Sequence, residues 1–181
     1  MSRFLFILVS LLPFYTSCQS LCREEILMYQ IIAQHEKVQK RKYNFDLIGS
    51  GGGIPDYVTN FSLHYVSTNQ VDMLKTRKMF VNNVEDLLQL INSNEQIRPY
   101  LSNYPFTINN LEFRISFQDR FGKRQEPPYV ALVSLINERI FYSFYDLSTR
   151  QFIGKDYSEP YSEARKMVLG EDPIVTDCSV K

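Results

Sequence analysis

The sequence predicts an α+β fold in which an antiparallel β-meander of four to five strands packs with a long amphipathic helix, preceded by an N-terminal helix. Alternating apolar and polar residues with short connections indicate consecutive strands at 110–118, 129–136 and 139–146. Apolar residues at helical spacing indicate the long helix over 68–92. The 12 Tyr and 13 Phe, with no Trp, suit the pleated surface of strands.

Residues 1–18 have the layout of an export signal. Arg3 supplies a positive charge, residues 4–15 form an uncharged apolar run, and small polar residues follow up to Cys18. The run is shorter than the roughly 20 apolar residues that span a bilayer as a helix. The sequence therefore predicts export rather than a membrane-spanning helix at this end.

The end of this segment resembles a bacterial lipobox, in which small residues precede a cysteine that becomes acylated. Thr16, Ser17 and Cys18 fit the pattern, whereas Tyr15 stands where an aliphatic residue is usual. The resemblance to small exported bacterial lipoproteins covers only these 18 residues. It implies palmitate or a similar lipid on Cys18, a membrane anchor and a periplasm-facing place in the cell envelope, and it supplies no catalytic residues. Ordinary cleavage after Ser20 is the alternative.

Two further cysteines lie near the ends of the remaining chain. In an oxidising compartment Cys22 and Cys178 are candidates for a disulfide that joins the N-terminal helix to the C-terminal tail at 171–181. Free thiols at both positions remain the alternative.

Residues 19–48 are interpreted as the N-terminal helix segment, with helical periodicity from 21 to 42. Its apolar stripe is assigned to Ile26, Tyr29, Ala33 and Val38. Basic residues crowd its C-terminal end, where cations complement the helix dipole. They form either a solvated helix end or a contact with anionic lipid. The basic residues are Lys37, Lys40, Arg41 and Lys42.

Residues 49–55 contain four of the seven glycines of the chain. A dinucleotide-binding loop needs a third glycine where Ile54 stands, and Pro55 opposes a helix start there. No G-K-[ST] sequence of a phosphate-binding loop follows. The segment is therefore interpreted as a glycine-rich joint between the N-terminal helix and an α+β domain at 56–170.

The α+β domain opens with a half-buried strand at 57–67, and Asn69 is predicted to cap the long helix. Residues 129–136 are apolar on both faces, which predicts a central strand covered on both sides. Asn137 and Glu138 connect it to the strand 139–146 as a two-residue hairpin. A weaker strand at 151–157 and a short helix at 161–169 complete the domain.

The sequence lacks the residue patterns of most enzymes and metal sites. The two histidines, His35 and His64, lie in different elements, and no C-x-x-C or H-x-x-x-H occurs. We therefore expect no metal and no cofactor. His64 is a candidate general base if a Ser or Asp converges on it, and a surface imidazole otherwise.

The strongest binding signal is a set of large rings on the hairpin and the strand before it. Exposed rings with polar tips are typical of an interface, whereas covered rings are core. The rings are Tyr129, Phe141, Tyr142, Phe144 and Tyr145.

Composition and charge limit the function. Lys+Arg and Asp+Glu are 20 each, so the formal net charge is zero, which argues against nucleic acid as a partner. The sequence favours a non-catalytic interaction module of the cell envelope that binds a protein or envelope component through the aromatic sheet face. A small periplasmic hydrolase using His64, and an inhibitor or immunity-type protein, are the alternatives.

Overall fold

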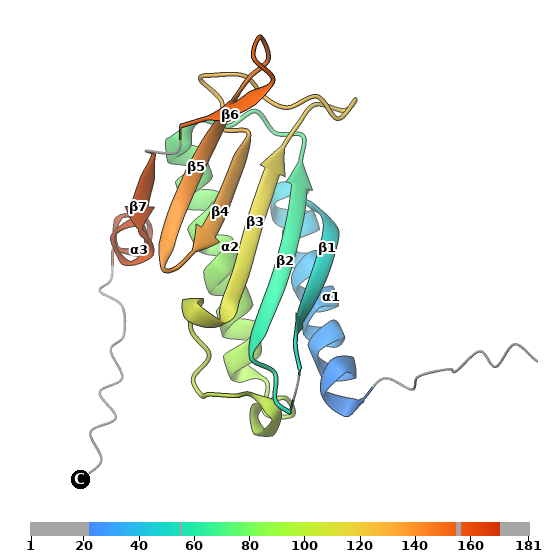
Figure 1. Cartoon of the computed structure of the whole chain (residues 1–181). Coiled ribbons are helices and arrows are strands. Elements are labelled where there is room, and N and C mark those ends of the chain that lie inside the picture. The colour runs from blue at the N-terminus through green and yellow to red at the C-terminus, as the bar shows by residue number, and fades with distance from the viewer. Residues whose placement is uncertain (1–21, 55, 155–156, 171–181) are drawn as a thin grey trace, which may run out of the picture.

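The computed structural model describes residues 22–54, 56–154 and 157–170. Within them the chain folds as α+β, with three α-helices and a seven-stranded, mostly antiparallel sheet (Figure 1). The helices are α1 (Arg23–Tyr43), α2 (Met73–Ser93) and α3 (Tyr161–Leu169). The strands are β1 (Asp46–Gly53), β2 (Asn60–Ser67), β3 (Leu111–Phe117), β4 (Leu132–Ile136), β5 (Arg139–Asp146), β6 (Gln151–Ile153) and β7 (Ser158–Pro160).

The sheet differs from the predicted meander in strand number and in one connection. Its order is β1-β2-β3-β4-β5-β6, and β7 pairs with β5 beside the start of that strand. β2 and β3 are parallel, and all other neighbours are antiparallel. A helix of 21 residues is about 31 Å long, so α2 returns the chain along the whole sheet and the next strand starts from the same end.

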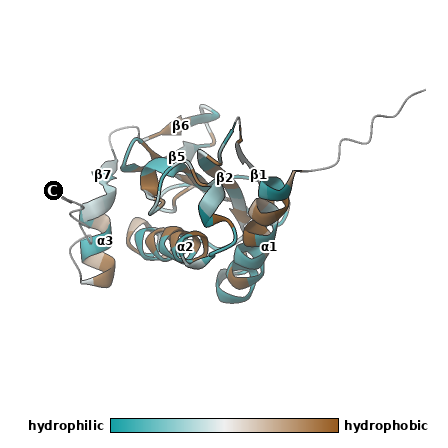
Figure 2. Cartoon of the chain, turned by 90° about the horizontal axis from the view of Figure 1, so that it is seen from below, coloured by the Kyte–Doolittle hydropathy of each residue, from teal (hydrophilic) through white to brown (hydrophobic). Residues whose placement is uncertain are grey.

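The helices α1 and α2 cover one side of the sheet, and Figure 2 shows α2 between α3 and α1. Alternate residues of β2, among them Phe61, Leu63 and Tyr65, are at most 1% exposed and form the centre of the core. Side chains alternate in the same way along β3, β4 and β5, so that every second side chain is buried against the helices. Among the described residues, no helix lies on the other side of the sheet.

The glycine-rich segment is a strand and not a joint. Gly49 to Gly53 pair with β2 from His64 to Asn60, so the run forms an edge strand of the same sheet against which α1 packs. None of these glycines has a positive φ. Their small size is what the strand requires: a Cβ on Gly52 would lie 2.4 Å from the backbone oxygen of Asn60 and 2.8 Å from Sδ of Met28.

We expect Gly52→Ala to lower the free energy of unfolding by about 1–3 kcal/mol, because the new methyl group overlaps β2 and α1. Gly51→Ala is the matched control, since no heavy atom lies within 4 Å of a Cβ at that position. The control is expected to be neutral or to gain up to about 1 kcal/mol from a stiffer unfolded chain. Urea titration followed by circular dichroism measures both. Equal effects of the two substitutions would contradict this account of the glycine strand.

The first helix presents a different side to the core from the predicted one. Its buried residues are Leu27, Met28, Ile31, Ile32, His35 and Gln39. Ile26 and Tyr29 of the predicted stripe are each 44% exposed. The buried side also includes the polar residues His35 and Gln39. The prediction considered only apolar residues, and it therefore placed the buried stripe on the wrong side of the helix.

Two other expectations also need correction. The start of α2 is capped by Asp72, whose side chain accepts a hydrogen bond of 2.8 Å from the backbone N–H of Lys75, and not by Asn69. β4 is covered on one side only, and Ile136 at its end is 52% exposed. The two-residue hairpin is confirmed: Asn137 and Glu138 have φ of 48° and 61°, as a turn between twisted strands requires.

Candidate binding face of the sheet

The side of the sheet without helices, here called the open face, is defined by the register of its strands. One row crosses the middle of the face as Gly49, His64, Arg114, Ser134 and Phe141. A lower row contains Ser62, Glu112, Ile136 and Arg139, in the continuing register of the same strands. The open face is therefore polar and cationic, with single apolar side chains between the polar ones.

The five predicted aromatic residues do not share this face. Tyr142 is 1% exposed and belongs to the core, and Phe144 packs on the core side with its ring 5.4 Å from that of Tyr157. Phe141 and Tyr145 alternate with them and lie, half-buried, on the open face. Tyr129 is half-buried in the loop before β4. The hairpin thus divides its rings between core and surface because strand side chains alternate.

The hydroxyl of Tyr142 makes a structural hydrogen bond. It donates a hydrogen bond to Glu159 of β7, and the same carboxylate accepts from Nε of Arg77 on α2 at 2.7 Å. Burial raises the pKa of Tyr142 far above its ordinary value, and the neighbouring carboxylate adds to the effect. The group therefore stays protonated and joins the sheet edge to α2.

Arg124 lies above the end of β5 and β6. Its guanidinium carbon is 4.6 Å from the ring centre of Phe152 and 5.7 Å from that of Tyr145. The two rings meet edge to face at 5.2 Å. The ring faces attract the cation electrostatically and hold it at this end of the open face.

His64 lies in the centre of the open face and contacts a hydroxyl. Its Nε2 is 2.8 Å from Oγ of Ser116, two residues along the neighbouring strand from its register partner Arg114. Partial burial lowers the pKa of His64, and the positive charges of Arg114 and Arg124 lower it further. The imidazole is therefore neutral near pH 7. Ser116 is only 7% exposed, so its hydroxyl is barely accessible.

A shallow hollow of about 570 Å³ lies at the lower end of the open face, between β3 and the β4–β5 turn. Its lining includes one cation, Arg114, two carboxylates, Glu112 and Glu138, and the apolar Ile136. No ion pair joins Arg114 or Arg124 to an acidic residue within the described part of the chain. Two unpaired guanidinium groups on one face favour a partner with negative charge.

The residues that make this face distinctive were not selected from the sequence. Arg114 is identifiable only as an outward residue of an alternating strand, and Arg124 comes from a loop without any periodic pattern. Phe152 meets Tyr145 because β6 pairs with β5. The only pattern in the sequence that concerns these residues is the alternation of apolar and polar side chains along a strand. Alternation assigns a residue to one face of its strand, but it does not say which residues of other strands and loops lie beside it.

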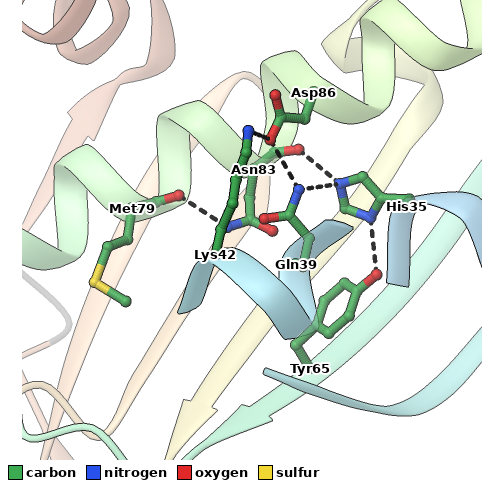
Figure 3. Close-up of polar contacts among 7 residues, drawn as sticks. All are labelled: His35, Gln39, Lys42, Tyr65, Met79, Asn83 and Asp86. Atoms are coloured by element: carbon green, nitrogen blue, oxygen red, sulfur yellow. Dashed lines mark hydrogen bonds and ion pairs between the residues drawn. The ribbon is translucent and has the colours of Figure 1, made fainter. Parts of the chain in front are cut away.

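A second polar cluster is buried between α1, α2 and β2 (Figure 3). His35 is fully buried; its Nε2 lies 3.0 Å from the backbone oxygen of Asn83 and its Nδ1 lies 2.8 Å from the hydroxyl of Tyr65. A carbonyl oxygen only accepts, so Nε2 carries the proton and Nδ1 accepts from Tyr65. Asp86 accepts from Gln39 at 2.9 Å and from Lys42 at 2.7 Å.

This cluster holds the first helix in place. Desolvation lowers the pKa of His35 to about 4, although the Asn83 carbonyl and the charge of Asp86 oppose the shift. Two buried acceptors, Oε1 of Gln39 and Oδ1 of Asn83, have no hydrogen-bond partner. His35 is thus a core residue and not a catalytic base.

The predicted lipidation and disulfide sites fall largely outside the described residues. Cys18 and Cys178 lie there, while Cys22 is exposed and precedes the first residue of α1. Among the described residues, no group of three or more His, Cys, Asp or Glu side chains is arranged to hold a metal ion. In the same residues, no helix combines the length and hydropathy needed to cross a membrane.

Comparisons of the chain with protein-family models, with curated proteins and with solved structures find no match.

Proposed function

We propose that the protein is a non-catalytic binding module that holds an acidic partner protein on the open face of its sheet. The observation that carries the proposal is the pair of unpaired guanidinium groups, Arg114 and Arg124, beside the half-buried rings of Phe141 and Tyr145. Arginine and aromatic residues dominate the binding energy of protein interfaces. The face is wide and shallow, which suits a protein surface better than an enclosed small molecule.

A photo-reactive residue at position 141 tests the proposal in cells. We expect a cross-linked adduct from position 141 and none from Leu74, which is 69% exposed on the opposite, helical side. Arg114→Glu combined with Arg124→Glu is expected to reduce the adduct at least tenfold, because two attractive charge contacts become repulsive. Arg98→Glu combined with Lys166→Glu, two charge reversals away from the open face, is the matched control. Equal adducts from both positions, or an adduct indifferent to the arginine variant, would refute the proposal.

The identity of a captured partner separates two forms of this function. An enzyme whose activity falls on binding would make the protein an inhibitor or immunity-type protein. A structural envelope component would make it an assembly or anchoring module.

Location in the cell envelope is part of the proposal and rests on the lipobox-like residues Thr16, Ser17 and Cys18. Labelling with radioactive palmitate, compared with Cys18→Ala, tests the anchor. Loss of label in the variant supports acylation at Cys18, and an unlabelled natural chain supports cleavage after Ser20 instead.

A small hydrolase is the second candidate, favoured by the 2.8 Å contact between His64 and Ser116. A neutral imidazole beside a hydroxyl is the first requirement of a serine nucleophile. Hydrolysis of p-nitrophenyl acetate tests it: a dyad requires that His64→Ala and Ser116→Ala each abolish turnover. Turnover that persists in either variant, or that is absent from the natural chain, removes this candidate.

A further inference from the structure

The side of α1 that faces away from the sheet carries an unusual combination of residues. Ile26 and Tyr29 are large, apolar in part and each 44% exposed. All exposed residues of this helix are apolar, amide-bearing or cationic, and none is acidic. They are Arg23, Ile26, Tyr29, Gln30, Ala33, Gln34, Lys37, Lys40, Arg41 and Lys42.

The positive charges on this side are only partly balanced. Lys40 pairs with Asp46 at 2.7 Å, and Lys42 pairs with Asp86 at 2.7 Å. Lys37 and Arg41 form no ion pair with an acid in the described residues. The three glutamates of the helix are half-buried at its flanks. The outward side of α1 is therefore apolar toward its start and cationic toward its end.

A cationic hollow of about 440 Å³ adjoins the end of this helix. Four cations line it, two from α1 and two from the first turns of α2, and no acidic residue is among its lining residues. The lining cations are Arg41, Lys42, Lys75 and Lys78. Tyr43, Asn44 and Asn69 add polar groups. Lys42 is paired with Asp86, and the other three cations supply positive charge that matches the oxygen atoms of phosphate groups.

An apolar segment precedes α1 at a short distance along the sequence. The uncharged run 4–15 is separated from Arg23 by only seven residues, 16–22. Seven residues span at most about 25 Å when fully extended. A membrane that receives either the apolar run or a lipid on Cys18 would therefore lie close to the start of α1.

We propose that the outward side of α1 and the cationic hollow together form a docking surface for a bilayer of anionic phospholipid. Ile26 and Tyr29 enter the interfacial region, Lys37 and Arg41 contact headgroups, and the hollow receives lipid phosphates. This surface lies on the helical side of the molecule, opposite the open face, so the bound membrane leaves the open face free. The proposal does not depend on the acidic partner, and it shares with the proposed envelope location the evidence of the segment before α1.

The experiment uses the full chain with Cys18, Cys22 and Cys178 replaced by serine and one new cysteine labelled with an environment-sensitive nitrobenzoxadiazole dye. The label is placed at Tyr29→Cys or, as a control, at Phe121→Cys, which is 79% exposed in a loop away from the helices. Vesicles contain phosphatidylcholine alone or with phosphatidylglycerol. We expect the label at 29 to brighten and shift to the blue with phosphatidylglycerol, and the label at 121 to remain unchanged.

Charge reversal tests the two parts of the surface. Lys37→Glu with Arg41→Glu, and Lys75→Glu with Lys78→Glu, are each expected to lower the affinity for phosphatidylglycerol vesicles on the order of tenfold or more. Lys123→Glu with Arg98→Glu is a control of equal charge change away from the surface. Thermal melting of each variant confirms that it is folded, so a lost response reports binding.

Three results would overturn the proposal. They are equal responses of the labels at 29 and 121, equal losses in the control and the surface variants, or a response that is the same on both kinds of vesicle. Saturable binding of inorganic phosphate that Lys75→Glu with Lys78→Glu removes, without preference for phosphatidylglycerol, would assign the hollow to a free phosphate compound instead.

Discussion

Replacing Phe113 by alanine is expected to lower the free energy of unfolding by about 3–5 kcal/mol. Phe113 lies at the centre of the core with 1% exposure, and its ring contacts those of Phe80 at 5.5 Å, Tyr65 at 5.7 Å and His35 at 6.1 Å. One substitution therefore removes packing from α1, α2 and β2 together. Denaturation in urea, followed by circular dichroism, measures the loss.

Phe121→Ala is the control for this substitution. Its ring is 79% exposed, so the same chemical change is expected to alter the free energy of unfolding by less than about 0.5 kcal/mol. A loss below about 1 kcal/mol at Phe113 would mean that the core between the helices and the sheet is not packed as described.

Acidification from pH 6.5 to pH 4 is expected to destabilise the protein by about 3 kcal/mol through His35 alone. The pKa of His35 is about 4 when folded and about 6.5 when unfolded, so the unfolded chain binds the proton more tightly. The full contribution is present above pH 6.5 and is lost as the pH falls toward 4. Asp86 of α2 and Lys42 of α1 carry the charges around the ring, and Tyr65 and Asn83 supply its hydrogen-bond partners.

The variant His35→Gln isolates this contribution. Glutamine keeps a donor and an acceptor but does not titrate, so its free energy of unfolding is expected to fall less steeply between pH 6.5 and 4 than that of the natural chain. Carboxylates titrate equally in both proteins and cancel in the difference. Parallel pH profiles of the two proteins would show that His35 is not held neutral in the fold.

Local patterns in the sequence were sufficient to predict several helices and strands. Asn137 tolerates positive φ, Asn137 and Glu138 together separate two apolar runs, and β5 spans the predicted residues 139–146. α3 likewise occupies the predicted residues 161–169. These elements are defined by interactions between residues close in the chain, which is why periodicity and turn chemistry identify them.

The glycine-rich segment shows where local pattern is insufficient. Glycine has low intrinsic strand propensity, and nothing in GSGGG signals a strand. The segment becomes β1 because β2 supplies hydrogen-bond partners and because Met28 and Asn60 leave room only for hydrogen at position 52. The same holds for α1, whose buried side includes His35 and Gln39 because their partners come from α2 and β2.

In the candidate site, too, local features could be predicted from the sequence and long-range ones could not. Sequence patterns were enough to predict the α+β class, the short-range elements and the alternation that places Phe141 and Tyr145 opposite Tyr142, since each depends on spacing along one strand or helix. Packing in three dimensions puts both long helices on one side of the sheet and brings Arg114, Arg124 and His64 together on the other side. Those positions depend on strand register and on the crossover through α2, which join residues 50 or more positions apart and leave no periodic mark in the sequence.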